Sequence, residues 1–186
     1  PDEGEIYVDG SALSGLDTKW VRENFGMVLQ DTWIMEGSIR ENLLFGRRDI
    51  SDEEMIDAAK ASGAHSFIRR LPHGYDTILK SGGEGISQGQ RQLLCITRVM
   101  LNVPPMLILD EATSSIDTRT ELKIQAAFGT MMSGRTTFIV AHRLSTVRSA
   151  DKILVIRNGN VVEIGNHEEL LAQKGFYYEL HTAQYE

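Results

Sequence analysis

A glycine-rich stretch ahead of a helical pattern is the first feature of the sequence that could do chemistry. It reads GEGISQGQRQLL and spans Gly83 to Leu94. Ser87 is a good N-cap, and the N–H groups and positive dipole end of a helix start favour anions such as phosphate. Gly89 would let a ligand approach the backbone closely. The stretch predicts a phosphate contact, although no lysine after a glycine loop lies beside it.

A pair of carboxylates follows an apolar run further along the chain. The letters LILDE place Asp110 and Glu111 at the end of a predicted buried strand. A carboxylate at a strand tip suits Mg²⁺, which keeps much of its water and takes only one or two protein carboxylates. Glu111 could then orient or deprotonate an attacking water. An acidic pair is also typical of a helix N-terminus, so the pair alone leaves both interpretations open.

Two more polar residues occupy predicted strand ends. Gln30 follows GMVL, and His142 follows IVA. Ligands of open α/β sheets bind beyond the carboxyl ends of the strands, which makes both residues candidates for the same site. A single histidine at a strand end is also common as a hydrogen-bonded structural residue. Trp33 is interpreted as a packing residue.

The elements that position these residues predict an α/β fold with a helical insertion. Apolar runs predict strands at 26–30, 106–110, 137–142 and 152–156, the last three continuous enough to be covered on both faces of a parallel sheet. Residues 5–9 predict a short strand, and Asn158-Gly159 a hairpin turn. Capping boxes mark helix starts at 51–54 and 166–169. The insertion covers roughly residues 31–101.

Composition limits the class of protein. A chain of 186 residues with 41% hydrophobic residues can form one globular domain with a subdomain. Its net charge of -7 argues against nucleic acid as a partner, since phosphate backbones require a basic face. The single Cys95 excludes an intrachain disulfide. No apolar run approaches the roughly 20 residues of a membrane span, and we expect the chain itself to be soluble.

The order of these features resembles the nucleotide-binding domain of ATP-binding-cassette transporters. ISQGQ, Ile86 to Gln90, is similar to the family's Leu-Ser-Gly-Gly-Gln signature, with Gln88 in place of the first glycine. The resemblance covers nearly all of that domain downstream of its phosphate-binding loop (Walker A). It implies a P-loop NTPase-like fold, with a mainly parallel core formed by 1–30 and 102–186 and a helical subdomain at 31–101.

The resemblance implies how the signature reaches ATP. In the family, two domains form a head-to-tail dimer, and the signature of one contacts the γ-phosphate held by the other. The residues assigned to this contact are Ser87, Gln88, Gly89 and Gln90. The lysine missing beside the signature would then belong to the partner domain.

The resemblance also implies roles for the residues at the strand ends. It makes Asp110 a Mg²⁺ carboxylate and Glu111 the general base. His142 would hydrogen-bond the γ-phosphate, and Gln30 would link Mg²⁺ and the attacking water to the helical subdomain. The stretch from Ser114 to Asp117 resembles the D-loop, which crosses the dimer interface.

The family's phosphate-binding loop, G-x-x-x-x-G-K-[ST], does not occur in this sequence. Gly10 to Asp17 has the glycine spacing, but Leu16 stands where lysine is required. The chain begins at Pro1 on a turn and strand pattern, and we expect it to be an N-terminally truncated part of a longer protein. Alone, it is expected to bind ATP poorly and to hydrolyse hardly any, because the β- and γ-phosphates lack their main ligands.

Two further stretches are similar to exporter members of the family, GSIRENLLFG at 37–46 and the run from Ala141 to Gly165. The expected parent is an ATPase that uses ATP and Mg²⁺ at the cytoplasmic face of the cell membrane. Its partners would be a second nucleotide-binding domain and a transmembrane domain on the same polypeptide. The alternatives are a soluble ATPase of the superfamily acting on nucleic acid or ribosomes, and a noncatalytic module that completes a partner's ATP site.

Overall fold

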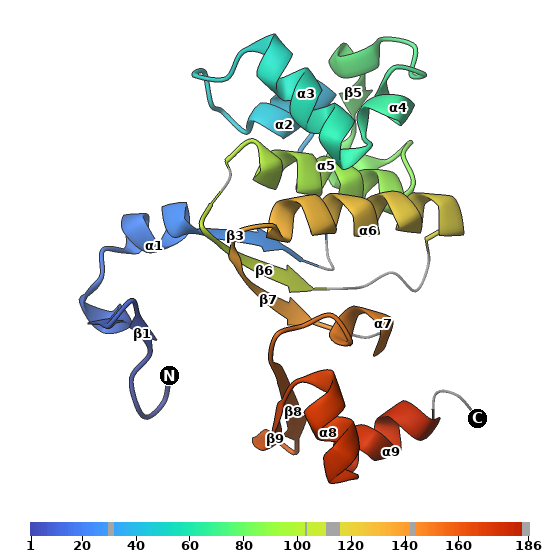
Figure 1. The fold of residues 1–186 in the computed structure, drawn as a ribbon. Helices are drawn as coiled ribbons and strands as arrows, with labels where there is room; N and C mark the ends of the chain where they lie inside the picture. The colour runs from blue at the N-terminus through green and yellow to red at the C-terminus, as the bar shows by residue number, and fades with distance from the viewer. Residues whose placement is uncertain (30–31, 103, 111–115, 142–143, 184–186) are drawn as a thin grey trace. The chain divides into compact units, whose positions relative to one another are not determined.

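The computed structural model describes residues 1–29, 32–102, 104–110, 116–141 and 144–183 (Figure 1). The chain divides into two compact units, residues 1–140 and 141–186. Each unit has its own cluster of buried apolar side chains. Among the described residues, no helix is both long enough and apolar enough to cross a membrane.

In the described part of the first unit, three parallel strands form the centre. β3 (Phe25–Val28), β6 (Met106–Asp110) and β7 (Thr136–Val140) pair in the order β3-β6-β7. This confirms the strand predicted at 106–110 and the parallel sheet. β3 ends two residues before Gln30, and β7 ends two residues before His142.

Helices cover one face of this sheet (Figure 1). α5 (Gln88–Met100) and α6 (Thr118–Met132) bury apolar residues against it, and α2 (Ile39–Leu44), α3 (Asp52–Ser62) and α4 (His65–Ile68) lie beyond them. The fully or almost fully buried residues of this cluster include Ile39, Leu43, Met55, Ile68, Leu94, Ile96, Leu107, Leu109 and Ile124.

The opposite face of the sheet is exposed in the part of the chain that the structure describes. Met27, Phe138 and Val140 expose 51%, 54% and 54% of their surface. The prediction that the apolar run at 137–142 is covered on both faces is therefore wrong for β7 in the part of the chain that the structure describes. An apolar run indicates that both faces of a strand tend to be buried. It does not indicate which segment of the protein covers each face.

The region between Ser38 and Leu101 is mostly helical, as predicted, and side-chain caps fix its helix starts. Ser51 and Glu54 form the predicted capping box at α3, and Ser38 and Glu41 form another at α2. Between α3 and α5, the buried hydroxyls of Ser62 and Thr97 form a hydrogen bond of 2.7 Å with each other. The other elements here are β4 (Gly37–Ser38), η2 (Gly74–Asp76), β5 (Ile78–Leu79) and η3 (Ser81–Gly83).

Short elements precede this sheet along the chain. β1 (Tyr7–Val8) and β2 (Ser11–Ala12) form a small antiparallel pair, followed by η1 (Leu13–Gly15) and α1 (Thr18–Asn24). The strand predicted at 5–9 is therefore present but shorter.

The described residues of the second unit form a hairpin and three helices. β8 (Ile153–Arg157) pairs with β9 (Asn160–Gly165) through the predicted turn at Asn158-Gly159. The strand predicted at 152–156 is present. Its described pairing with β9 is antiparallel, so the prediction that it belongs to a parallel sheet is wrong. The helices are α7 (Leu144–Val147), α8 (His167–Gln173) and α9 (Phe176–Ala183), and α8 begins at the predicted capping box.

Candidate nucleotide site

The start of α5 has the geometry of an anion contact. The hydroxyl of Ser87 accepts a 3.3 Å hydrogen bond from the N–H of Gln90, and the Gln90 side chain accepts one of 2.9 Å from the N–H of Ser87. None of the hydrogen bonds of the described residues uses the N–H of Gln88 or Gly89. These two donors lie at the positive end of the helix dipole, where a phosphate oxygen is favoured.

Gly89 is buried, and its small size is needed for packing. A Cβ at this position would lie 2.5 Å from Cγ2 of Thr120 and 2.9 Å from Cγ2 of Ile116. The starts of α5 and α6 therefore touch at Gly89. The sequence predicted that Gly89 serves a ligand, whereas the structure gives a second reason for glycine here, the close approach of α6.

Gly89→Ala is expected to destabilise the chain by about 1–3 kcal/mol, because the added methyl group overlaps Thr120 and Ile116. Gly129→Ala is the matched control, since Gly129 lies within α6 with no atom within 4 Å of an added Cβ. The control is expected to be neutral or to gain about 0.5–1 kcal/mol in helix stability. Urea unfolding of both variants measures the difference, and equal midpoints would contradict the packing role of Gly89.

Two acidic residues flank the segment between β6 and α6. Asp110 is the last residue of β6 and is half-buried, and it lies beside Val140 of β7 in register. Asp117 caps α6 by accepting a 3.0 Å hydrogen bond from the N–H of Thr120. Hydrogen bonds from the side chain and backbone of Thr120 hold the pKa of Asp117 below its ordinary value. Asp117 is therefore positioned as a carboxylate beside the start of α5.

Four predicted site residues lie outside the described residues: Gln30, Glu111, Ser114 and His142. Their roles stay predictions. In the described part of the chain, no group of three or more His, Cys, Asp or Glu residues is placed to hold a metal. Asp110 still fits Mg²⁺, because this ion needs only one or two protein carboxylates when phosphates and water complete its shell.

An exposed aromatic patch was missed by sequence reasoning. Trp33 exposes 60% of its surface, so its interpretation as a packing residue is wrong, and its ring meets that of Phe45 edge-on at 5.7 Å. Phe45 exposes 52% and has a left-handed backbone, with φ 49°, at the end of α2. Glycine is the usual residue for that conformation, so the sequence gave no signal that Phe45 would adopt it.

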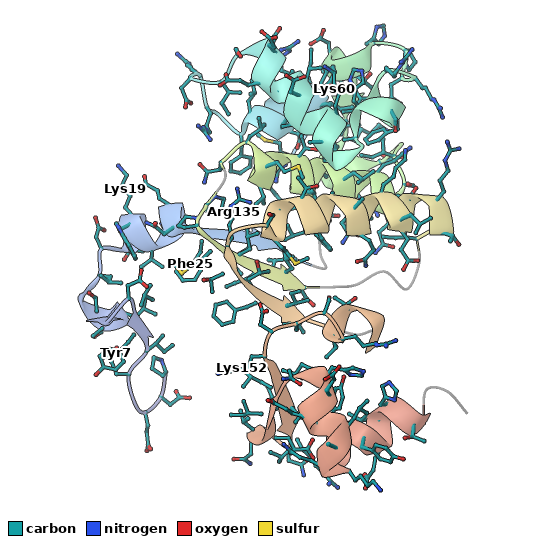
Figure 2. All side chains as sticks on the ribbon, viewed as in Figure 1. Tyr7, Lys19, Phe25, Lys60, Arg135 and Lys152 are labelled. Carbon is teal, nitrogen blue, oxygen red and sulfur yellow. The ribbon has the colours of Figure 1, made fainter. Side chains whose placement is uncertain are left out.

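Arg98 joins this patch to a cavity. Its guanidinium lies 4.8 Å from the Phe45 ring centre, and its Nε donates a 2.9 Å hydrogen bond to the carbonyl of Asn42. Burial lowers the pKa of Arg98. The adjoining cavity, of about 430 Å³, begins near Phe25, which is labelled in Figure 2. Its described lining has three arginines, Arg22, Arg47 and Arg98, and no carboxylate.

Comparison with known proteins decides the family. A family model described as ABC transporter matches residues 1–114, which include the start of α5 and the end of β6. The chain belongs to the ABC transporter family. Over all 186 residues it is 53% identical to the uncharacterized ABC transporter ATP-binding protein YfiC of Bacillus subtilis and covers 31% of that protein.

Other ABC transporters give the same result. The chain is 48% identical over 97% of its length to a fatty acid ABC transporter ATP-binding/permease protein of Mycobacterium bovis, of which it covers 28%. It is 45% identical over 98% of its length to an ATP-dependent lipid A-core flippase of Syntrophus aciditrophicus, of which it covers 30%. The chain thus spans less than a third of the length of these relatives.

A solved structure confirms the fold class. The chain matches a bacterial Atm1-family ABC exporter with ATP bound, with a TM-score of 0.89 and 39% identity, over 98% of this chain and 32% of that one. The resemblance to the ATP-binding domain of ABC exporters, stated from the motifs, is confirmed. The mainly parallel α/β core with inserted helices is confirmed with it.

Proposed function

We propose that this chain is the ATP-hydrolysing part of an exporter that moves a substrate across a membrane. The observation that carries the proposal is the 48% identity, over 97% of the chain, to a protein named as both ATP-binding and permease. The parent protein would hold the chain at the cytoplasmic face of its membrane. Its core would comprise 1–30 and 102–186, and its helical subdomain 31–101.

The start of α5 is proposed to bind the γ-phosphate of ATP held by a second copy or a related domain. The free N–H groups of Gln88 and Gly89 support an anion contact, and Ser87 is exposed to a partner. Because the sequence has no glycine loop with its lysine, the groups that bind the rest of that phosphate chain must come from elsewhere. The neighbouring Asp117 would lie at the same dimer interface.

The residues at the strand ends are proposed to act on the ATP of the chain's own domain. Asp110 would hold Mg²⁺, largely through water, together with Gln30. Glu111 would accept a proton from the attacking water, and His142 would hydrogen-bond the γ-phosphate and orient that water. Mg²⁺ supplies charge neutralisation at the phosphates when it is bound.

The chain alone is proposed to be inactive, because its sequence has no glycine loop with its lysine. Met27, Phe138 and Val140 are exposed in the described structure, and β7 is an edge strand among the described residues. Residues upstream of Pro1 in the parent would supply the glycine loop and cover for this sheet.

The test compares the 186-residue chain with the same chain extended upstream through the glycine loop of its parent. We expect the extended chain to bind Mg-ATP and hydrolyse it, and the shorter chain to show neither at millimolar ATP. Isothermal titration calorimetry and phosphate release measure the two properties. Tight ATP binding by the shorter chain would contradict the proposed role of the loop.

The aromatic patch of Trp33 and Phe45 is proposed to contact the transmembrane part of the parent. Exposed aromatic side chains are enriched at the centres of protein interfaces, and here they adjoin a mainly apolar cavity whose lining includes three arginines. The partner surface would present apolar and acidic side chains.

Hydroxyl-radical footprinting by mass spectrometry tests this contact. Oxidation of Trp33 and Phe45 is expected to fall several-fold in the full-length protein relative to the 186-residue chain. Trp20, which exposes 40% of its surface, is the matched control and should change little. Equal oxidation of Trp33 in both samples would exclude the proposed contact.

A further inference from the structure

A second cavity lies away from the proposed nucleotide site. It is partly open to solvent, has a volume of about 550 Å³ and is lined by α3, the ends of α5 and α6, and the start of β6. Leu107, near the start of β6, lines it, whereas Asp110 lies at the opposite end of that strand. None of the predicted site residues that the structure describes lines this cavity. Its volume is in the range of small-molecule sites.

The walls of the cavity are mainly apolar. Met100 and Leu101 come from the end of α5, and Met131 comes from the end of α6. On the α3 side, the lining residues Ala58 and Ala61 are small, which leaves the space open. A ligand with an apolar body would cover these apolar side chains. Removing their surface from water contributes favourably to the free energy of binding.

The acidic side chains around the cavity already have partners. Asp49 accepts two hydrogen bonds from Arg47, of 3.2 and 2.7 Å. Asp57 pairs with Lys60 at 2.7 Å. Glu54 accepts the capping hydrogen bonds of Ser51, which lower its pKa. Each of these carboxylates therefore already has a hydrogen-bond or ion-pair partner within the chain.

Arg135 differs from these groups. Figure 2 labels it near the end of α6, and its guanidinium donates to the carbonyl of Met131. None of the ion pairs between described residues involves Arg135, although it is half-buried and lines the cavity. A guanidinium carries five N–H donors in a planar fork suited to a carboxylate, so most of its capacity remains.

We propose that this cavity binds an amphipathic monocarboxylate, with its carboxylate on Arg135 and its apolar body between Ala58, Met100 and Leu107. Two charge-assisted hydrogen bonds from the guanidinium of Arg135 would hold the carboxylate. The apolar walls would favour a ligand whose chain or ring carries no further charge. The site does not depend on the proposed ATPase function, because its lining includes none of the described residues of the nucleotide site.

Decanoate is the probe, titrated onto the isotope-labelled 186-residue chain and followed by amide NMR shifts and calorimetry. We expect saturable shifts at Ala58, Ala61 and Arg135. Arg135→Gln should weaken binding about tenfold or more, and Arg135→Lys less, because the charge is kept but the fork is lost. Arg119→Gln is the matched control, since Arg119 is exposed at the start of the same helix.

Two further arms keep the test independent of the stability of the Arg135 variants. Ala58→Leu fills the cavity from α3 and should abolish the shifts. Decylammonium, of the same chain length, should bind at least tenfold more weakly than decanoate. The proposal is overturned by equal binding of the two amphiphiles, by unchanged binding to Arg135→Gln, by shifts elsewhere on the chain, or by no binding at millimolar decanoate.

Discussion

Replacing Glu111 with glutamine in the full-length protein is expected to lower ATP hydrolysis by about 10²–10⁴-fold, the usual contribution of a general base. Glutamine keeps the size of the side chain but cannot accept a proton from the attacking water. ATP binding should be retained, because Asp110 and the phosphate contacts are unchanged. Phosphate release and nucleotide binding, measured on the same preparation, separate the two effects.

The matched control is Glu53→Gln, an exposed carboxylate in the first turn of α3 that is remote from β6 along the chain. It should leave hydrolysis near that of the unchanged protein. If Glu111→Gln retained full turnover, the base would have to be another group. If it lost ATP binding as well, Glu111 would act in holding the nucleotide.

A mixed dimer should show that Ser87 serves the ATP of the opposite chain. Ser87→Asp preserves a good N-cap but places a negative charge where the γ-phosphate is proposed to bind, so hydrolysis should fall about 10²-fold or more. When one chain carries Ser87→Asp and the other Glu111→Gln, both defects fall in one site and the other site is intact. Such dimers, purified through two different tags, should be clearly more active than dimers in which every site carries a defect.

The reciprocal dimer gives the opposite expectation. When one chain carries both changes and its partner carries neither, each site receives one defect and activity should stay low. An arrangement in which Ser87 and Glu111 of one chain serve the same ATP predicts the reverse results for the two dimers. Recovery in the reciprocal dimer would therefore contradict the head-to-tail proposal. The design applies to a parent that forms homodimers.

Local chemistry explains which parts of the fold could be predicted from the sequence. The capping boxes at 51–54 and 166–169, the helix start at Ser87 and the turn at Asn158-Gly159 depend on residues a few positions apart, and all are present. The pairing of β4 with β5 joins residues about 40 positions apart and has no local signal. The antiparallel partner of β8 was missed because an apolar run does not specify strand direction.

The candidate site was predictable to a similar extent. Asp110 ends its strand, as the apolar run predicted, whereas the N-cap role of Asp117 at α6 was not predicted. Gly89 was interpreted through a ligand, because its contact with Thr120 joins two helices that are separate in sequence. The exposure of Trp33 and Phe45 could not be predicted either, because large aromatic side chains are mostly buried in folded proteins.

The contact at Gly89 also bears on how two ATP sites of a dimer would communicate. The side chains of Ile116 and Thr120 lie against the backbone of Gly89. Gly89 has no side chain that could change its conformation to absorb a movement there. A shift of the α6 start, which follows Asp110 and Glu111, would therefore carry Ser87 with it. In the proposed head-to-tail dimer, Asp110 and Ser87 of one chain serve different ATP molecules. The packing of a single chain would thus make turnover at the two sites cooperative.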